Sequence, residues 1–361
     1  MGQIRTYAAL DVHMSKVAAV TVDSETGELR HKRLPGDTRR VANYVAKQPG
    51  PVLATYEAGP TGYGLARALA DRDVTCLVAA PGKIPRSAQD RIKTDRRDAE
   101  KLVRLLMAGE LKPVRVPTTR EEALRDLVRA REDIRGDLMR NRHRLGKMLL
   151  RHDIHYTETK SRWGERHRRW LGQVKLSDPA AQAAYLDYLG AIDGLVVRRD
   201  TVEQTLGGLV PDSPWADTVA RFRCLRGINT LTAVGLCAEV GDFARFEKPK
   251  QLMGYLGLVP SEQSSGDKRR QGSITKSGSR HARRLLVEAA WHNRWQPRTG
   301  EDLAKRQVGQ PDVVIAIAWN AQRRLFNTWR RLDRRRGKRR TVVAVAAARE
   351  LAGFCWAVAN A

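Results

Sequence analysis

The chain has 361 residues and carries 66 Lys and Arg against 40 Asp and Glu, a formal net charge of +26. That length predicts two or three domains, and the positive charge makes nucleic acid the expected partner. A ribosome-like structural protein or an Arg-rich, GC-biased sequence would share this composition. We find no run apolar enough to span a bilayer and no secretory signal, so we expect a cytoplasmic protein with no membrane partner.

Residues 1–117 alternate short apolar runs with helical patterns, which predicts an α/β domain. Strands are expected at Ile4–Leu10, Val17–Val22, Val52–Tyr56 and Val74–Ala79, and a helix is expected at Tyr63–Ala70. Turn-forming residues at 23–28 make part of the sheet antiparallel. This element order is that of an RNase H-like fold, although the pattern alone leaves the topology open.

Four acidic side chains stand at the ends of these elements. Asp11 follows the first strand, Glu57 ends the third, and Asp95 and Asp98 lie three residues apart at the start of the next helix. If the fold brings them together, their oxygens are ligands that Mg²⁺ or Mn²⁺ prefers, and two such ions clamp a transferring phosphate. For any single acid, a surface or capping position is the simpler interpretation.

Other metal or redox patterns in the chain are weak. The cysteines (Cys76, Cys224, Cys237 and Cys355) form no CxxC pair, which is typical of reduced residues in a cytosolic protein. His152 and His155 have no partner cluster, so a solvated basic loop is the better interpretation.

Residues 118–210 predict a helical middle region. A long helix at Thr118–Arg151 begins with overlapping capping boxes and carries a heptad pattern, which predicts a coiled-coil seam with Arg131 and Asn141 as polar interruptions. A second helix at Pro179–Leu209 has similar spacing. The two helices can pair within one chain or dimerise between chains.

The segment between these helices is basic and carries Trp163 and Trp170. Basic residues interspersed with aromatic ones suit backbone contact and base stacking on single-stranded or looped RNA. Alternatively, the two indole rings anchor the segment to the coiled coil, because aromatic side chains bury readily.

Residues 215–300 and a helical tail at 301–361 complete the expected organisation. Leu225–Ala233 resembles a helix-hairpin-helix turn, which offers backbone N–H groups to phosphates, but Asn229 replaces the usual second glycine. In the tail, Arg330–Arg340 is a dense basic run that suits either a solvated face or phosphate contact.

A basic, Gly- and Ser-rich loop lies within residues 264–278. It contains Ser264, Ser265, Lys268, Arg269, Arg270 and Lys276. A flexible loop with solvated charges is the simple interpretation. The alternative is a nucleophilic serine, whose hydroxyl needs its proton removed and the developing charge neutralised. The basic side chains could supply that field, and with no adjacent histidine the activation would fall to the carboxylate site.

Two groups of motifs follow the pattern of a known family. The first comprises Ala9-Leu10-Asp11-Val12-His13, Tyr56-Glu57-Ala58-Gly59 and Lys93-Thr94-Asp95-Arg96-Arg97-Asp98-Ala99. The second comprises 238–246, 257–261, Ser265-Gly266 and 272–278. They resemble, in order, the N-terminal DEDD domain and the C-terminal transposase domain of the IS110 family of insertion-sequence transposases. The resemblance spans nearly the whole chain, and Gly-Ile-Asn in place of Gly-Ile-Gly is the one departure.

This resemblance implies a fold and a chemistry. It implies a RuvC-like domain at 1–117, a coiled-coil and basic insertion at 118–210, a serine-containing transposase domain at 215–300 and a basic tail. On this basis Asp11, Glu57, Asp95 and Asp98 bind Mg²⁺, and Ser265, or less suitably Ser264, attacks DNA to form a phosphoserine link.

The implied partners are donor DNA, target DNA and a noncoding RNA encoded by the element, which pairs with both DNAs. A homodimer or tetramer in the bacterial cytosol, associated with the nucleoid, is also implied. The expected nucleic-acid contacts are Lys93, Trp163, Trp170, Lys268, Arg269, Arg270 and Lys276.

Two other functions fit parts of the sequence. A RuvC-like, metal-dependent nuclease for Holliday junctions or other DNA structures would need the four acids but no serine. A non-catalytic, nucleic-acid-binding structural protein would need neither.

Overall fold

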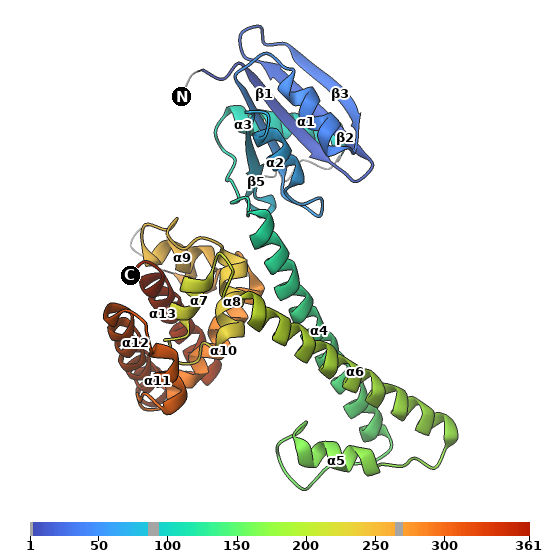
Figure 1. Ribbon diagram of the computed structural model, residues 1–361, viewed down its shortest axis with the longest axis vertical. Helices are drawn as coiled ribbons and strands as arrows, with labels where there is room; N and C mark the ends of the chain where they lie inside the picture. Colours follow the sequence, from blue (N-terminus) through green and yellow to red (C-terminus); the bar gives the residue numbers. More distant parts are fainter. Residues whose placement is uncertain (1–2, 86–93, 264–269) are drawn as a thin grey trace. The chain divides into compact units, whose positions relative to one another are not determined.

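The computed structural model describes residues 3–85, 94–263 and 270–361. It divides into two compact units, Met1–Thr118 and Thr119–Ala361 (Figure 1). Unit 1 is a mixed α/β layer structure, and unit 2 is almost entirely helical.

Unit 1 is built on a five-stranded sheet with strand order β3-β2-β1-β4-β5. Its strands are β1 (Thr6–Val12), β2 (Lys16–Asp23), β3 (Leu29–Pro35), β4 (Val52–Glu57) and β5 (Thr75–Ala79). Strands β1, β2 and β3 pair antiparallel, whereas β1, β4 and β5 run parallel. The hairpin turn at 23–28 and the antiparallel part of the sheet therefore lie where the sequence predicted them.

The sequence prediction missed β3 and the helix that follows it, α1 (Thr38–Ala46). Strand β3 reads LRHKRLP and is exposed along nearly its whole length, so it lacks the apolar alternation that marks a strand. It lies at the edge of the sheet, where charged side chains are favoured because they discourage pairing with other chains.

Helices cover both faces of the sheet. On one face, α1 and α2 (Gly64–Ala70) pack on a core that includes Ala8 and Leu10 of β1. On the other face, α3 (Asp95–Met107) packs on a core that includes Ala9. Alternate residues of a strand point to opposite faces, so β1 contributes to both layers. A short 3₁₀ turn at Pro81–Lys83 follows β5.

Unit 2 begins with a helical hairpin made of α4 (Thr119–Arg151) and α6 (Pro179–Leu209). The start of α4 shares a core with the end of α6, and the end of α4 shares one with the start of α6. The helices are therefore antiparallel partners within one chain, the first of the two arrangements that the sequence allowed. Arg131, a polar interruption of the heptad pattern, donates to Glu203 of α6.

The remaining helices of unit 2 are α5 (Glu165–Gln173), α7 (Ala216–Phe222), α8 (Thr230–Val240), α9 (Pro249–Tyr255), α10 (Arg280–Ala290), α11 (Glu301–Gln307), α12 (Asp312–Arg330) and α13 (Arg340–Ala359). Strands β6 (Pro260–Glu262) and β7 (Gln271–Ile274) form a small antiparallel ribbon. Short helical turns follow α10 at Trp291–Arg294 and α12 at Arg331–Arg335. Apolar side chains of α8, α10, α12 and α13 share one core, so residues 301–361 pack with 215–300.

The prediction that no segment is long and apolar enough to span a bilayer was wrong for helix α13. Arg340–Ala359 passes that test by length and composition. One face of the helix, including Val343, Ala347 and Leu351, is buried in the core of unit 2, as in the central helix of a folded domain. The sequence scan missed it because many of its apolar residues are small alanines.

The turn between α7 and α8 differs in detail from the expected one. Gly227 has a φ of +88°, and a Cβ there would lie 2.3 Å from the carbonyl oxygen of Ala289, so only glycine fits. Asn229 has extended backbone and caps α8, since its side chain accepts from the N–H of Thr232. Its role is that of an N-cap and not that of a left-handed turn residue.

Candidate active site

The sheet of unit 1 carries Asp11 and Glu57 to the same end of two neighbouring strands. Strands β1 and β4 run parallel, with Leu10 beside Tyr56, so Asp11 and Glu57 follow at adjacent positions. Asp11 is two residues beyond Ala9, which packs against α3, and therefore lies on the α3 face of the sheet. Glu57 shares that face because it holds the matching position on β4.

Helix α3 brings two more acids to this face. Thr94 caps the helix by accepting from the N–H of Arg97, which places Asp95 and Asp98 in its first turn. Acidic side chains are favoured there because the free N–H groups of a helix start carry partial positive charge. The apolar face of α3, which includes Ala99 and Val103, holds the helix against the sheet.

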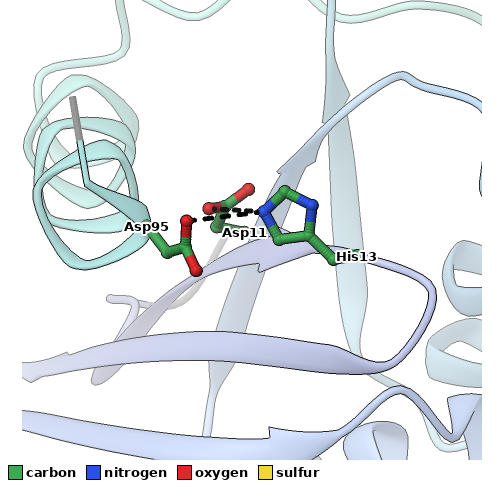
Figure 2. Close-up of side chains that lie close together, drawn as sticks. All are labelled: Asp11, His13 and Asp95. Carbon is green, nitrogen blue, oxygen red and sulfur yellow. Dashed lines mark hydrogen bonds and ion pairs between the residues drawn. The ribbon is translucent and has the colours of Figure 1, made fainter.

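The closest cluster consists of Asp11, Asp95 and His13. One potential ligand atom from each lies within 4.8 Å of the others. Figure 2 shows the His13 ring facing both carboxylates, with Nε2 3.3 Å from Asp11 Oδ2 and 3.7 Å from Asp95 Oδ1. Lys16 donates to Asp95 Oδ2 at 2.5 Å. We call Asp11, Glu57, Asp95 and Asp98 together the carboxylate edge.

The electrostatics of this edge differ from one acid to the next. Burial raises the pKa of Asp11, and the charges of Asp95 and Asp98 raise it further, while His13 opposes the shift. The hydrogen bond from Lys16 lowers the pKa of Asp95. Like charges thus gather around Asp11, and only His13 and Lys16 offset them within the pairs described here.

This donor set suits a divalent cation. Carboxylate oxygens are ligands for hard cations, and an imidazole nitrogen is compatible with Mn²⁺ as well as softer metals. A cation placed among Asp11, Asp95 and His13 would stabilise the charged form of Asp11, which burial and the charges of Asp95 and Asp98 disfavour. The cluster also lies partly open to solvent, since the Asp95 side chain is 42% exposed, so a phosphate can reach it.

Two residues at this site, His13 in the cluster and Lys16 bound to Asp95, were not among the predicted site residues. His13 stands two residues after Asp11, and the period of a strand places residues i and i+2 on one face. Lys16 opens β2 across the hairpin from the end of β1, where Val12 pairs with Val17. The two-residue period of a strand could have predicted that His13 lies beside Asp11. The position of Lys16 could be predicted only with the register of the β1–β2 hairpin.

Several predicted residues lie outside the described part of the chain. These are Lys93, Ser264, Ser265, Lys268 and Arg269. Of the others, Arg270 precedes β7, and Lys276 follows it with a φ of +57°. The N–H of Lys276 donates to Gly257 O, so the end of the ribbon is tied to the end of α9.

Trp163 and Trp170 lie at the far end of the helical hairpin from α8. Both are partly buried and pack against a core formed by α4, α5 and α6. Trp170 lies 5.2 Å from Tyr156, and Trp163 lies 5.2 Å from His167, measured between ring centres. This packing favours anchoring of the segment, but it leaves parts of both rings accessible.

Comparisons with known proteins identify the family. Residues 8–153 match the model of a DEDD transposase family, and residues 219–303 match the model described as "Transposase IS116/IS110/IS902 family". The chain is 42% identical over 359 residues to y4qE, a protein of Sinorhizobium fredii named as a transposase, covering 98% of this chain and 88% of that one.

Two further relatives are named as transposases of particular insertion sequences. The transposase for IS1533 of Leptospira borgpetersenii is 31% identical over 340 residues, covering 92% of this chain and 98% of that one. The transposase for IS1111A of Coxiella burnetii is 39% identical over 70 residues, about a fifth of either chain. The chain therefore belongs to the IS116/IS110/IS902 family of transposases, enzymes that act on DNA.

Proposed function

We propose that this transposase is guided by RNA and cleaves and rejoins DNA strands through a phosphoserine link, using a metal held by the carboxylate edge. The observation that carries the proposal is the approach of Asp11 and Asp95 to one another, from a strand end and a helix start that are 84 residues apart in sequence. Acids brought together on a chain of net charge +26, with the pKa of Asp11 raised, mark a candidate functional site.

The topology of unit 1 supports an RNase H-like, RuvC-like assignment. Its order β3-β2-β1-β4-β5, with the first three strands antiparallel and the last two parallel to β1, puts Asp11 on the central strand. In such a sheet the end of the central strand is open to a ligand, whereas its neighbours cover the strand edges. The metal ligands in this proposal are Asp11, Glu57, Asp95 and Asp98, with His13 beside them.

Mg²⁺ or Mn²⁺ bound there would neutralise charge that develops on the transferring phosphate. One oxygen each of Asp11 and Asp95 lies within 4.8 Å of the other, while Glu57, at the end of β4, and Asp98, in the first turn of α3, are outside that cluster of described residues. In this structure the Lys16 ammonium neutralises part of the negative charge by donating to Asp95. Its flexible ammonium can move to a DNA phosphate oxygen when Asp95 turns to another cation.

Ser265 is the proposed nucleophile. Its Oγ attacks a backbone phosphorus, the bond from phosphorus to the 3′ oxygen breaks, and the serine proton passes to that leaving oxygen. A phosphoserine ester and a free 3′-hydroxyl result. Attack by a 3′-hydroxyl of another strand then forms a new phosphodiester and returns the proton to Ser265, so bond types are conserved and no energy source is needed.

The remaining parts of the proposal concern assembly and guidance. We assign 1–117 to the RuvC-like domain, 118–210 to the coiled coil and its basic insertion, 215–300 to the serine domain and 301–361 to the tail. The long α4–α6 hairpin supports a coiled-coil assignment, and assembly of dimers or tetramers lets one subunit supply the acids and another the serine. A noncoding RNA of the element pairs with donor and target DNA in the bacterial cytosol.

The test is Ser265→Ala in the full-length protein, with Ser264→Ala as its neighbour control. We expect the Ser265 variant to lose the covalent protein–DNA adduct, detected as a shifted band after denaturation, and to keep RNA binding. An adduct that persists in Ser265→Ala and disappears in Ser264→Ala would move the nucleophile by one residue.

Other outcomes of that test discriminate between functions. Metal-dependent strand cleavage that persists with no adduct in either serine variant would overturn the phosphoserine proposal and favour a RuvC-like junction nuclease. Sequencing the RNA that co-purifies tests guidance, since a discrete noncoding RNA is expected and bulk cellular RNA would contradict it.

A further inference from the structure

A cavity of about 480 Å³ lies at the end of the helical hairpin, between α4, α5 and the loop that joins them. Aromatic rings from the loop and α5, namely Tyr156, Trp163, His167 and Trp170, form one wall. Basic residues of α4 and the loop form its rim, among them Arg142, Lys147 and Arg162. Ligand pockets in proteins have volumes of roughly 300–1,000 Å³, so this space suits a small organic group.

The aromatic rings of this wall pack against one another. Tyr156 packs edge-on against His167 at 4.7 Å between ring centres, and His167 lies 5.5 Å from Trp170. The backbone N–H of Trp163 donates to His167 Nδ1 at 3.2 Å. In the neutral imidazole the proton is therefore on Nε2. Burial, with Arg162 and Arg142 nearby, lowers the pKa of His167, so this ring is neutral at pH 7.

Trp163 has a backbone conformation that costs energy. Its φ is +69°, a value that bulky residues rarely adopt. Residues held in such conformations concentrate at ligand clamps and active sites, where the surrounding structure fixes them. Trp163 in this conformation has its indole ring beside Arg142, whose guanidinium carbon lies 4.7 Å from the ring centre.

Within the part of the chain that the structure describes, Arg142 makes no ion pair with an acid. Its Nε is buried without a hydrogen-bond acceptor among the described residues. Burial lowers the pKa of this guanidinium, and Arg199 and Arg168 lower it further as like charges. Those two arginines have carboxylate partners of their own, because Asp200 accepts from Arg199 and Asp193 accepts from Arg168.

A half-buried guanidinium with no carboxylate partner among the described residues, beside an aromatic wall, is complementary to one ligand class. A nucleotide supplies a phosphate for the guanidinium and a flat base for the rings and the Arg142 plane. We propose that this cavity captures a single unstacked nucleotide of a nucleic acid, with Arg142 contacting its phosphate and the aromatic wall stacking its base. The site needs neither the carboxylate edge nor the serine, and it shares with the proposed function only nucleic acid as the ligand.

The test is photo-crosslinking of the full-length protein to a short single strand that carries one 5-iodouracil, made as RNA and as DNA of the same sequence. We expect the crosslinked base to map to Tyr156, Trp163 or Trp170. Crosslinks found only elsewhere, for example in the basic turn at Arg331–Arg335, would overturn the proposal. The arm that reacts, RNA or DNA, identifies the source of the nucleotide.

Arg142→Met and Arg144→Met make a matched pair, since each removes one charge from α4 but Arg144 is exposed and does not line the cavity. We expect Arg142→Met to lower the crosslink yield at least about tenfold, as loss of a charged hydrogen bond predicts, and Arg144→Met to change it little. Equal yields from the two variants would contradict the role of Arg142. Far-UV circular dichroism checks that both fold, and Arg142→Lys should restore part of the yield.

The same preparation separates this proposal from the function proposed above. A protein that shows no DNA cleavage but crosslinks at the aromatic wall would keep the cavity assignment and lose the catalytic one. Cleavage and adduct formation at the wild-type rate without any crosslink at the wall would do the opposite.

Discussion

The carboxylate edge of unit 1 gathers negative charges, and the surroundings of Arg142 in unit 2 gather positive ones. Burial raises the pKa of Asp11 and lowers that of Arg142, and like charges add to each shift: Asp95 and Asp98 at the edge, and Arg199 and Arg168 near Arg142. Charges of one sign are held together at a cost unless a partner of the other sign joins them. This contrast supports the two proposals made above, a cation at the first cluster and an anion at the second.

A third group of charged side chains, on α4, α8 and α10 of unit 2, contains both acids and bases, and each charge has a partner of opposite sign. His281 lies 3.6 Å from Glu132 and 3.5 Å from Glu239, Arg284 binds Glu132, and Arg129 approaches Glu239. We call these five residues the ion-pair network. Acids and bases alternate in this network, so their charges offset one another while the ion pairs link α4, α8 and α10.

The largest expected effect tests the carboxylate edge. Asp11→Asn keeps the shape of the side chain but removes its charge, so we expect metal-dependent DNA cleavage to fall on the order of 10³-fold. Asp71→Asn, at the exposed end of α2, is the control and should cleave normally. Cleavage of end-labelled DNA in Mg²⁺ measures both, and wild-type activity in Asp11→Asn would remove the edge from catalysis.

The next effect tests the ion-pair network as a structural element. Burial raises the pKa of Glu239, but His281, Arg129 and Ser279 outweigh it and hold that pKa at about 2. Because the folded pKa is below its ordinary value of 4.5, this stabilisation is present above pH 4.5 and is lost as the pH falls toward 2. Glu239→Gln should lower the free energy of unfolding by about 3 kcal/mol at pH 7.

Urea denaturation followed by tryptophan fluorescence measures this difference. The gap between Glu239→Gln and wild type should close as the pH approaches 2, whereas Glu301→Gln, an exposed residue of α11, should stay within about 0.5 kcal/mol throughout. A gap that does not change with pH would mean that Glu239 acts through packing and not through its charge.

A smaller effect concerns Lys16. Its ammonium competes for Asp95 with any bound cation, and exposed ion pairs contribute about 0.2–1 kcal/mol. Lys16→Met should therefore tighten Mn²⁺ binding about two- to fivefold. Electron paramagnetic resonance of free Mn²⁺ measures the affinity, with Lys32→Met on the exposed strand β3 as the control. Weaker binding in Lys16→Met would show that Lys16 supports the site instead of competing for it.

The smallest expected effect separates the Arg142 cavity from the paired contacts of the hairpin. Arg142→Met removes a cation that has no acidic partner among the described residues, so the melting temperature should stay the same or rise slightly. Arg131→Met breaks the bond to Glu203 and should cost about 1 kcal/mol. Equal losses for the two variants would indicate that Arg142 stabilises the fold.

The sequence determined the elements with strong local signals. Helix α6 begins and ends at the predicted residues, and α4 differs by one residue, because capping residues and long apolar spacing mark their ends. The strands that carry Asp11 and Glu57 were also predicted, since buried strands have continuous apolar runs. Strand β3 and helix α1 were missed because an exposed edge strand has no such run.

Tertiary structure decided which charges meet. The sequence placed acids at element ends, but the parallel pairing of β1 with β4 and the packing of α3 put Asp11 and Asp95 together and added His13 and Lys16. It also gave Arg142 an aromatic neighbour and, among residues 3–85, 94–263 and 270–361, no acidic partner, which no local pattern in α4 indicates. Local propensities act over a few residues, whereas the field at a charge depends on every group within several ångströms, whatever its place in the chain.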